Sequence, residues 1–179
     1  MNLKKFAGLG LAMALMAPVG VLAAQPAGAA AVLTCSPPSG SVTFSPGLSS
    51  TPKIQTTTFK LPIKGCKGTA GVTGGTSAGS SKGTTKSTCT SLAGGATKTT
   101  VTITWSNKKT STSTLSTQVV KGAPGVITAT VNGKITKGLF LGKTLKTKVK
   151  ITIPKSAKCT DAAPLKTATL SGLASVTIS

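Results

Sequence analysis

The sequence predicts an all-β fold, either an antiparallel β-sandwich or a closed barrel of about 8–10 strands, with two disulfides. Three observations indicate this fold class. Apolar and polar residues alternate with a period of two in many segments. Turns rich in Gly and Pro separate these segments at intervals of about eight to twelve residues. Beyond the N-terminal region, no segment has the period of an amphipathic helix.

The clearest predicted strand runs from Thr144 to Ile153. Leu145, Val149 and Ile151 fall on one face, and lysines alternate with them on the other. This pattern is typical of a strand that buries one face and exposes the other to water. Similar alternation predicts strands over residues 41–45, 54–63, 97–106, 112–121, 126–131, 135–141 and 167–178.

Three segments carry turn or loop signals. Asn132-Gly133 lies between two alternating runs and predicts a β-hairpin, because both residues tolerate the positive φ angles of a tight turn. Pro46-Gly47 is predicted to end a short strand. Residues 65–96 are rich in Gly, Ser, Thr and Lys, and we expect one or two short strands there, joined by a mobile tip.

The N-terminus has the parts of a secretory signal, namely a basic start, an apolar run and an Ala-rich segment. We predict a signal peptide over residues 1–30, cleaved between 23 and 31, and a single all-β domain over 31–179. A retained membrane anchor is an alternative, although Pro18 interrupts the apolar run; lipid attachment at Cys35 is another. The signal implies a secreted protein, extracellular or at the cell surface, without a transmembrane segment after processing.

Four cysteines follow the predicted signal, and an even number in an exported chain predicts two disulfides. Three pairings are possible. We favour Cys35 with Cys66 and Cys89 with Cys159. A zinc site is not expected, because the chain has no His and no close cysteine pair with the spacing of metal ligands. No metal and no cofactor are predicted.

The chain has a formal net charge of +20, and its only acidic residue is Asp161. Such an excess of lysine attracts polyanions, and salt weakens that attraction. The lysine-rich strand face is therefore a candidate contact for an anionic polymer; the simpler interpretation is that these lysines keep exposed strands soluble and unpaired. The candidate contact residues are Lys134, Lys137, Lys143, Lys146, Lys148 and Lys150.

Catalysis is not expected. One carboxylate side chain excludes a pair of catalytic carboxylates, and a Ser or Cys nucleophile has no His base. Composition leaves a Ser–Lys dyad open, but Ser106 and Lys109 lie in a polar turn. Asp161 is interpreted as a turn residue that bonds local backbone, or alternatively as the acid of a Lys–Asn isopeptide bond. Sequence-specific nucleic-acid binding is not expected, because the chain has no Arg and few aromatics.

The chain resembles, in general pattern, the uncharacterised small secreted β-rich proteins of actinobacteria. The likeness covers most of the mature chain, and the residues that carry it are turn and strand signals. These are Cys35, Phe44-Ser45-Pro46-Gly47-Leu48, Gly65-Cys66, Val72-Thr73-Gly74-Gly75, Thr104-Trp105 and Gly138-Leu139-Phe140. The resemblance implies a secreted all-β domain without an assigned activity.

Two functions follow as expectations. The first is a secreted, non-enzymatic β-domain that associates with anionic cell-surface or extracellular polymer through its lysine-rich strand faces. The alternative is a structural or coat-like component of the cell surface that binds protein, with the charge serving solubility only. The sequence does not specify an oligomeric state.

Overall fold

The computed structural model describes residues 32–89, 96–121 and 125–179. The predicted signal peptide lies outside these described residues. Eleven strands and no helix occur in the described part of the chain. The strands are β1 (Leu33–Cys35), β2 (Ser39–Leu48), β3 (Lys53–Ile63), β4 (Lys67–Gly68), β5 (Gly75–Ser87), β6 (Ala96–Trp105), β7 (Thr110–Lys121), β8 (Val126–Gly138), β9 (Thr144–Thr152), β10 (Leu165–Gly172) and β11 (Val176–Ile178).

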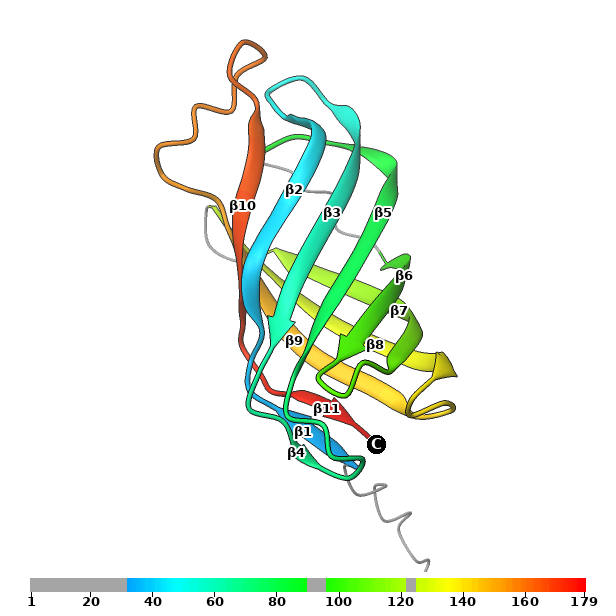
Figure 1. The fold of residues 1–179 in the computed structure, drawn as a ribbon. Helices are drawn as coiled ribbons and strands as arrows, with labels where there is room; N and C mark the ends of the chain where they lie inside the picture. Colours follow the sequence, from blue (N-terminus) through cyan, green and yellow to red (C-terminus); the bar gives the residue numbers. More distant parts are fainter. Residues whose placement is uncertain (1–31, 90–95, 122–124) are drawn as a thin grey trace, which may run out of the picture.

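Eight of these strands close into an antiparallel barrel (Figure 1). Along the chain, β2, β3, β5, β6, β7, β8, β9 and β10 each pair with the next, and β10 also pairs with β2. Thr169 marks the closure, because it lies opposite Ser41 of β2 and Thr152 of β9. The fold is therefore an up-and-down barrel, and the barrel rather than the sandwich is the correct alternative.

Three short strands extend the sheet at one end of the barrel. β11 pairs with the start of β9, β1 pairs with β11, and β4 pairs with β1. Figure 1 shows these strands at the lower end, beside the C-terminus. The predicted strand over 167–178 is thus two strands, and Ala174 is exposed between them.

The alternation predicted from the sequence sorts the barrel side chains as expected. On β9, Leu145 and Val149 are buried in the barrel, whereas Lys146 and Lys148 are exposed. The same period applies on β6, where Thr99, Val101, Ile103 and Trp105 are buried. We call the space enclosed by the eight strands the lumen.

The lower end of the barrel is packed around Trp105, which is 1% exposed. Its ring contacts Phe140 edge to face, with 5.6 Å between the ring centroids. The indole Nε1 donates a hydrogen bond of 2.8 Å to Ser111 Oγ, which in turn donates to the carbonyl of Leu139. Phe140 and Leu139, in the turn after β8, are thereby tied to β6 and β7 respectively.

The two disulfides have the favoured pairing. Cys35 at the end of β1 is bonded to Cys66, which directly precedes β4. Cys89, which follows β5, is bonded to Cys159 in the connection between β9 and β10. The second disulfide lies beside a cluster at the upper end formed by Val42, Phe44, Leu48, Leu165 and Ala168.

Two predicted loops are wrong. The expected mobile tip within residues 65–96 is the middle of β5, a strand of 13 residues that pairs with β3 over most of its length. Glycine is needed there for packing: a Cβ on Gly79 would lie 2.9 Å from Cζ of Phe59 and 3.1 Å from Cγ2 of Val101. Glycine in this segment therefore admits large inward side chains from neighbouring strands.

The Asn132-Gly133 hairpin is also wrong, because β8 continues through it to Gly138. The separate strand predicted over 135–141 is therefore the end of β8 over residues 135–138, and its last three residues lie in a turn. A Cβ on Gly133 would lie 2.5 Å from Cδ2 of Leu115, so this glycine makes room for a leucine across the sheet. The chain turns over residues 139–143 instead. Similarly, Pro46-Gly47 does not end β2, which runs to Leu48.

Asp161 does not bond local backbone, as was expected of a turn residue. Its Oδ2 accepts a 2.6 Å hydrogen bond from Thr51 Oγ1, and its Oδ1 accepts one of 3.3 Å from Thr51 N, 110 residues away. Asp161 thus joins the loop that carries Cys159 to the turn between β2 and β3. The bond from the Thr51 hydroxyl, with a further contribution from the hydroxyl of Ser49, lowers the pKa of the Asp161 carboxyl.

This lowered pKa predicts how the stability of the folded protein changes at acid pH. In the unfolded chain the Asp161 carboxyl has an ordinary pKa of about 3.9, which is above its pKa in the folded protein. The stabilisation that the ionised Asp161 gives the folded state is therefore complete above about pH 3.9, and it is lost as pH falls through the folded pKa. We expect the Tm of the wild type to be nearly flat from about pH 5 to 8, since the chain has no His and no Glu. Below about pH 4 the Tm difference between the wild type and Asp161→Asn should shrink toward zero. Parallel pH profiles for the two proteins would contradict this assignment.

Candidate functional site

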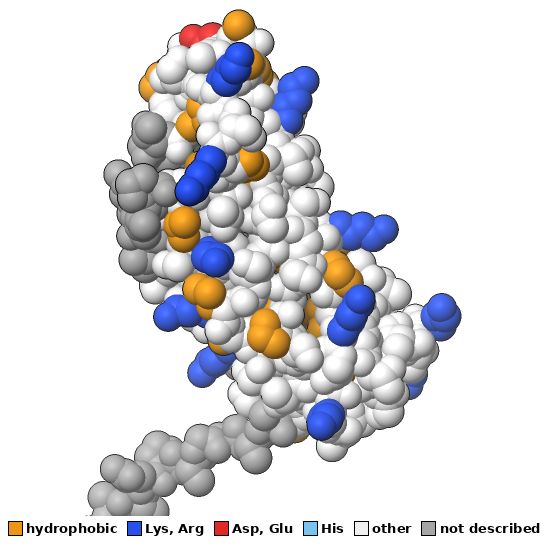
Figure 2. Space-filling view, turned by 90° about the vertical axis from the view of Figure 1, so that its left-hand side faces the viewer, with side chains coloured by type: hydrophobic (Ala, Val, Ile, Leu, Met, Phe, Trp, Pro, Cys, Tyr) orange, Lys and Arg blue, Asp and Glu red, His pale blue; other side chains and the backbone are white. Residues whose placement is uncertain are grey.

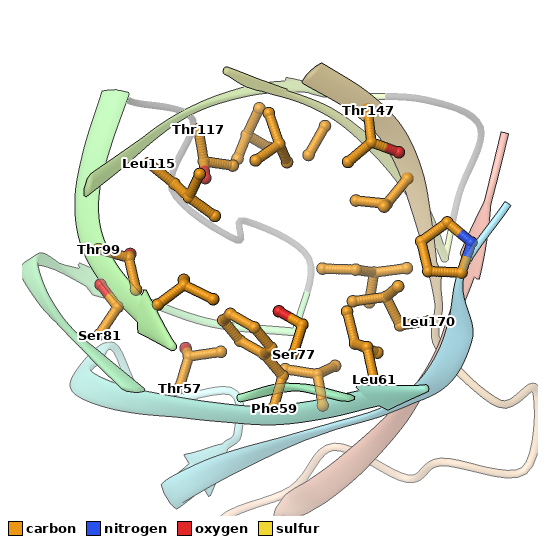
Figure 3. A pocket seen from close by; sticks show the side chains of 18 of the residues that line it. Thr57, Phe59, Leu61, Ser77, Ser81, Thr99, Leu115, Thr117, Thr147 and Leu170 are labelled. Atoms are coloured by element: carbon orange, nitrogen blue, oxygen red, sulfur yellow. The ribbon is translucent and has the colours of Figure 1, made fainter. Parts of the chain in front are cut away.

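The lumen contains a cavity of about 240 Å³. Residues from all eight barrel strands line it, and Figure 3 shows their side chains converging on an open centre. Protein interiors normally hold few voids larger than one water molecule. This cavity is much larger than a packing defect, although it is smaller than the range of about 300–1,000 Å³ typical of sites for drug-sized ligands.

The cavity wall is mainly apolar and includes no charged side chain. Aromatic and aliphatic residues such as Phe44, Phe59, Leu115, Val131, Val149 and Leu170 supply most of it. A wall of this kind holds water poorly, because water requires two or more polar partners to remain in a cavity. An apolar molecule is a better occupant.

A few hydroxyl groups interrupt the apolar wall. Thr57, Ser81, Thr99 and Thr117 point into the lumen from four different strands (Figure 3). Among the described residues, these four hydroxyls have no hydrogen-bond partner. In the same part of the chain, every fully buried side-chain nitrogen or oxygen has a partner, so the four hydroxyl oxygens are not fully buried. The four hydroxyls therefore remain accessible to a molecule in the lumen. A small number of polar groups on an apolar wall is the usual composition of a small-molecule site.

The upper end of the lumen is held in place by Gln55, which is 4% exposed. Its Oε1 accepts a 3.1 Å hydrogen bond from Gly47 N, and its Nε2 donates one of 3.0 Å to Gly47 O. Both ends of the amide are thus satisfied by the main chain of β2. Gln55 lines the cavity, but its amide is already hydrogen-bonded to Gly47.

The ladder between β5 and β6 is incomplete. The two strands pair only where Gly75–Gly79 lies opposite Trp105–Val101. Beyond this point β5 continues to Ser87, and β6 begins at Ala96, without pairing to each other. Figure 1 shows the upper part of β5 diverging from β6. We call these unpaired parts of the two strands the β5–β6 opening, and Ser81, Gly83 and Thr99 of the cavity lining belong to them.

The six candidate lysines lie on and beside β9. Lys146, Lys148 and Lys150 alternate along its outer face, with neutral residues opposite each of them on β8. Lys134 and Lys137 lie on the second half of β8, and Lys143 immediately precedes β9. Lys143 and Lys150 are half-buried and the other four are exposed. Figure 2 shows lysines spread along the face in view and separated by neutral side chains.

The arrangement defines a class of protein: an eight-stranded antiparallel barrel with an apolar lumen. Comparison of the chain with known protein families, with curated proteins and with solved structures gave no match. Within residues 32–89, 96–121 and 125–179, no helix has the length and apolar character needed to cross a membrane. The same residues contain no group of three or more His, Cys, Asp or Glu side chains placed to bind a metal ion.

The lumen was not predicted from the sequence. The available signal was the size of the inward residues, because Thr57, Ser77 and Thr117 occupy positions where a filled barrel would have larger side chains. Alternation identifies which residues point inward. Whether they fill the interior depends on barrel closure, which the pattern does not specify.

Proposed function

We propose that this protein is a non-enzymatic binding protein that holds a small, mainly apolar molecule in the barrel lumen. The observation that carries the proposal is the cavity of about 240 Å³ with an uncharged, mainly apolar wall. Burying apolar ligand surface there contributes about 25 cal/mol per Å². Eight-stranded barrels are either filled by their own side chains or just wide enough for one small ligand, and this barrel is not filled.

Energetics favour a ligand over an unused void. Each Å³ of unfilled cavity costs about 24 cal/mol of stability, so a void of this size costs on the order of several kcal/mol. Larger residues at Thr57, Ser77 or Thr117 would remove that cost. An occupant offsets it in the same way, and a binding role therefore explains the small inward residues.

The test uses 1-aminoanthracene, a neutral fluorescent probe for apolar sites. We expect saturable binding to the wild type. Ala129 is buried and lines the lumen, so Ala129→Trp should fill the cavity and weaken binding by about 100-fold or more. Asn132→Trp, on the exposed outer face of the same strand, should leave binding within about twofold.

Ala129→Leu is a milder variant for the same test, should the tryptophan prevent folding. Far-ultraviolet circular dichroism confirms that each variant is folded. The proposal fails if the wild type does not bind the probe saturably. It also fails if folded Ala129 variants bind as tightly as Asn132→Trp.

A second candidate function is association with anionic cell-surface or extracellular polymer. Lys146, Lys148 and Lys150 support it, because alternate residues of a strand lie about 6.6 Å apart and would present a regular row of positive charge. The neutral residues opposite them on β8 do not neutralise that row. In the alternative role, as a structural or coat-like component, the lysines would serve solubility only.

Retention on anionic beads across a salt series distinguishes these roles. Changing Lys146, Lys148 and Lys150 to Gln should lower the salt concentration needed for elution, since fewer counterions are exchanged. The control changes three exposed lysines elsewhere, Lys60, Lys109 and Lys155, to Gln. Equal shifts in the elution salt concentration for the two triple variants would argue against a local polymer site on β9. That result would favour the structural or coat-like role.

We also propose that the mature protein is extracellular. The predicted signal peptide supports this location, and the two disulfides are compatible with an oxidising compartment. A secreted binding protein would meet its ligand outside the cell.

A further inference from the structure

Two lysines lie three positions beyond the last pair of the β5–β6 ladder, Lys82 on β5 and Lys98 on β6. The last pair of the ladder is Gly79 with Val101. If this register continued, Lys82 of β5 would lie directly opposite Lys98 of β6. Like charges directly opposite each other destabilise an antiparallel pair. Both lysines are exposed, so a continued ladder would bring two ammonium groups together on the outer face.

The inner side of the same opening carries two hydroxyls. Continuing the register also sets Ser81 opposite Thr99, and both residues line the cavity. Figure 3 labels both side chains among those that line the cavity. From outside to inside, the opening thus presents two ammonium groups, then two hydroxyls, and then the apolar wall. This order matches a molecule with an anionic head and an apolar tail.

We infer that the β5–β6 opening holds the anionic head of a single-chain amphiphile, with Lys82 and Lys98 binding the head and the lumen holding the tail. This inference rests on the proposed binding function and specifies its ligand class. The head would neutralise the repulsion that keeps the two strands apart. The only acidic side chain of the sequence, Asp161, is engaged with Thr51, so no acidic side chain is free for this purpose.

The size of the cavity favours one chain over two. At about 240 Å³ it is below the volume of typical drug-sized sites, so a branched or double-chain lipid would not fit within it. A carboxylate or a phosphate monoester head would satisfy the same four groups, because lysine ammoniums and hydroxyls donate hydrogen bonds to either.

Displacement of 1-aminoanthracene by dodecanoate, dodecyl phosphate and dodecanol tests the inference. Wild type should bind the two anions at least about tenfold more tightly than the alcohol, because charge-assisted hydrogen bonds are about twice as strong as neutral ones. The variant Lys82→Gln with Lys98→Gln should lose most of that preference and keep its affinity for dodecanol. Lys60→Gln with Lys109→Gln, which makes the same change in net charge on other exposed positions, should retain the preference.

The displacement experiment separates the anionic-head inference from the proposed binding function. Equal affinity of the wild type for the alcohol and the anions would overturn the inference and leave the binding function intact. An equal loss of preference in both double variants would also overturn it, because the effect would then be general charge. Failure of the wild type to bind the neutral probe would instead overturn the binding function. Preference for only one of the two anions would identify the head.

Lys82→Glu tests the cause of the opening without any ligand. It would set a carboxylate opposite the ammonium of Lys98, so the ladder should extend beyond Gly79. Amide hydrogen exchange at residues 80–82 and 98–100 should slow by about threefold or more relative to Lys60→Glu, and release of 1-aminoanthracene should slow as well. Unchanged exchange at these amides would refute the role of the two lysines in holding the strands apart.

Discussion

Replacing Trp105 with alanine is expected to lower the free energy of unfolding by about 3–5 kcal/mol. The side chain is 1% exposed and fills the lower end of the barrel, so its removal leaves a cavity that the surrounding sheet cannot close. The substitution also removes the edge-to-face contact with Phe140 and the hydrogen bond to Ser111. Urea unfolding followed by far-ultraviolet circular dichroism measures the loss.

Two variants separate the contributions of the ring and of its polar atom. Trp105→Phe keeps most of the apolar volume, and should cost clearly less than the alanine variant. Ser111→Ala keeps the ring but leaves the indole N–H and the Leu139 carbonyl without a partner, which should cost about 1–3 kcal/mol. A loss below about 1 kcal/mol for Trp105→Ala would show that the lower end of the barrel repacks freely.

The strands were predictable because each of them buries one face only. In a closed antiparallel barrel the inner side is apolar and the outer side faces water, so every strand has the period of two. The residues of β9 illustrate this point, since Leu145 and Val149 turn inward while Lys146 and Lys148 turn outward. Strand existence and facing are local properties, and the sequence pattern contains them.

Barrel closure was not predictable from that pattern. Sandwiches and barrels both use alternating strands, and they differ in which edges pair. Closure depends on the pairing of β10 with β2, which places Thr167 opposite Thr43 over a long separation in sequence. The wrong loops have a related cause, because Gly79 and Gly133 are small in order to accommodate side chains of other strands. In a local sequence pattern glycine indicates a turn, but in this sheet it allows a side chain of a neighbouring strand to approach the backbone closely.

The candidate sites also differ in whether the local sequence pattern predicts them. The outer position of the lysines on β9 follows from alternation. The lumen depends on the combined volume of inward residues from eight strands, and the β5–β6 opening depends on where the ladder between these two strands ends, at Gly79 opposite Val101. Both are properties of the assembled barrel.

Removing the disulfide between Cys89 and Cys159 is expected to lower the free energy of unfolding by about 4 kcal/mol. The bond joins residues separated by 70 positions, and a loop of that length has much conformational entropy in the unfolded chain. It also fixes the long connection between β9 and β10 over the cluster of Leu48, Leu165 and Ala168. Cys89→Ala with Cys159→Ala should therefore lower the Tm by about 8–16 °C, measured by circular dichroism.

The other disulfide provides the comparison that isolates the effect of position. Cys35 and Cys66 are separated by only 31 residues, so loop entropy alone predicts a slightly smaller loss, by about 0.7 kcal/mol, for their alanine variant. Because that bond lies beside β1 and β4, its removal should leave hydrogen exchange at the upper ends of β2 and β10 unchanged. Removal of the Cys89–Cys159 bond should accelerate exchange there, since the connection that covers the cluster is released. Equal acceleration in both variants would mean that each disulfide acts only through the unfolded chain, and that neither secures one end of the barrel.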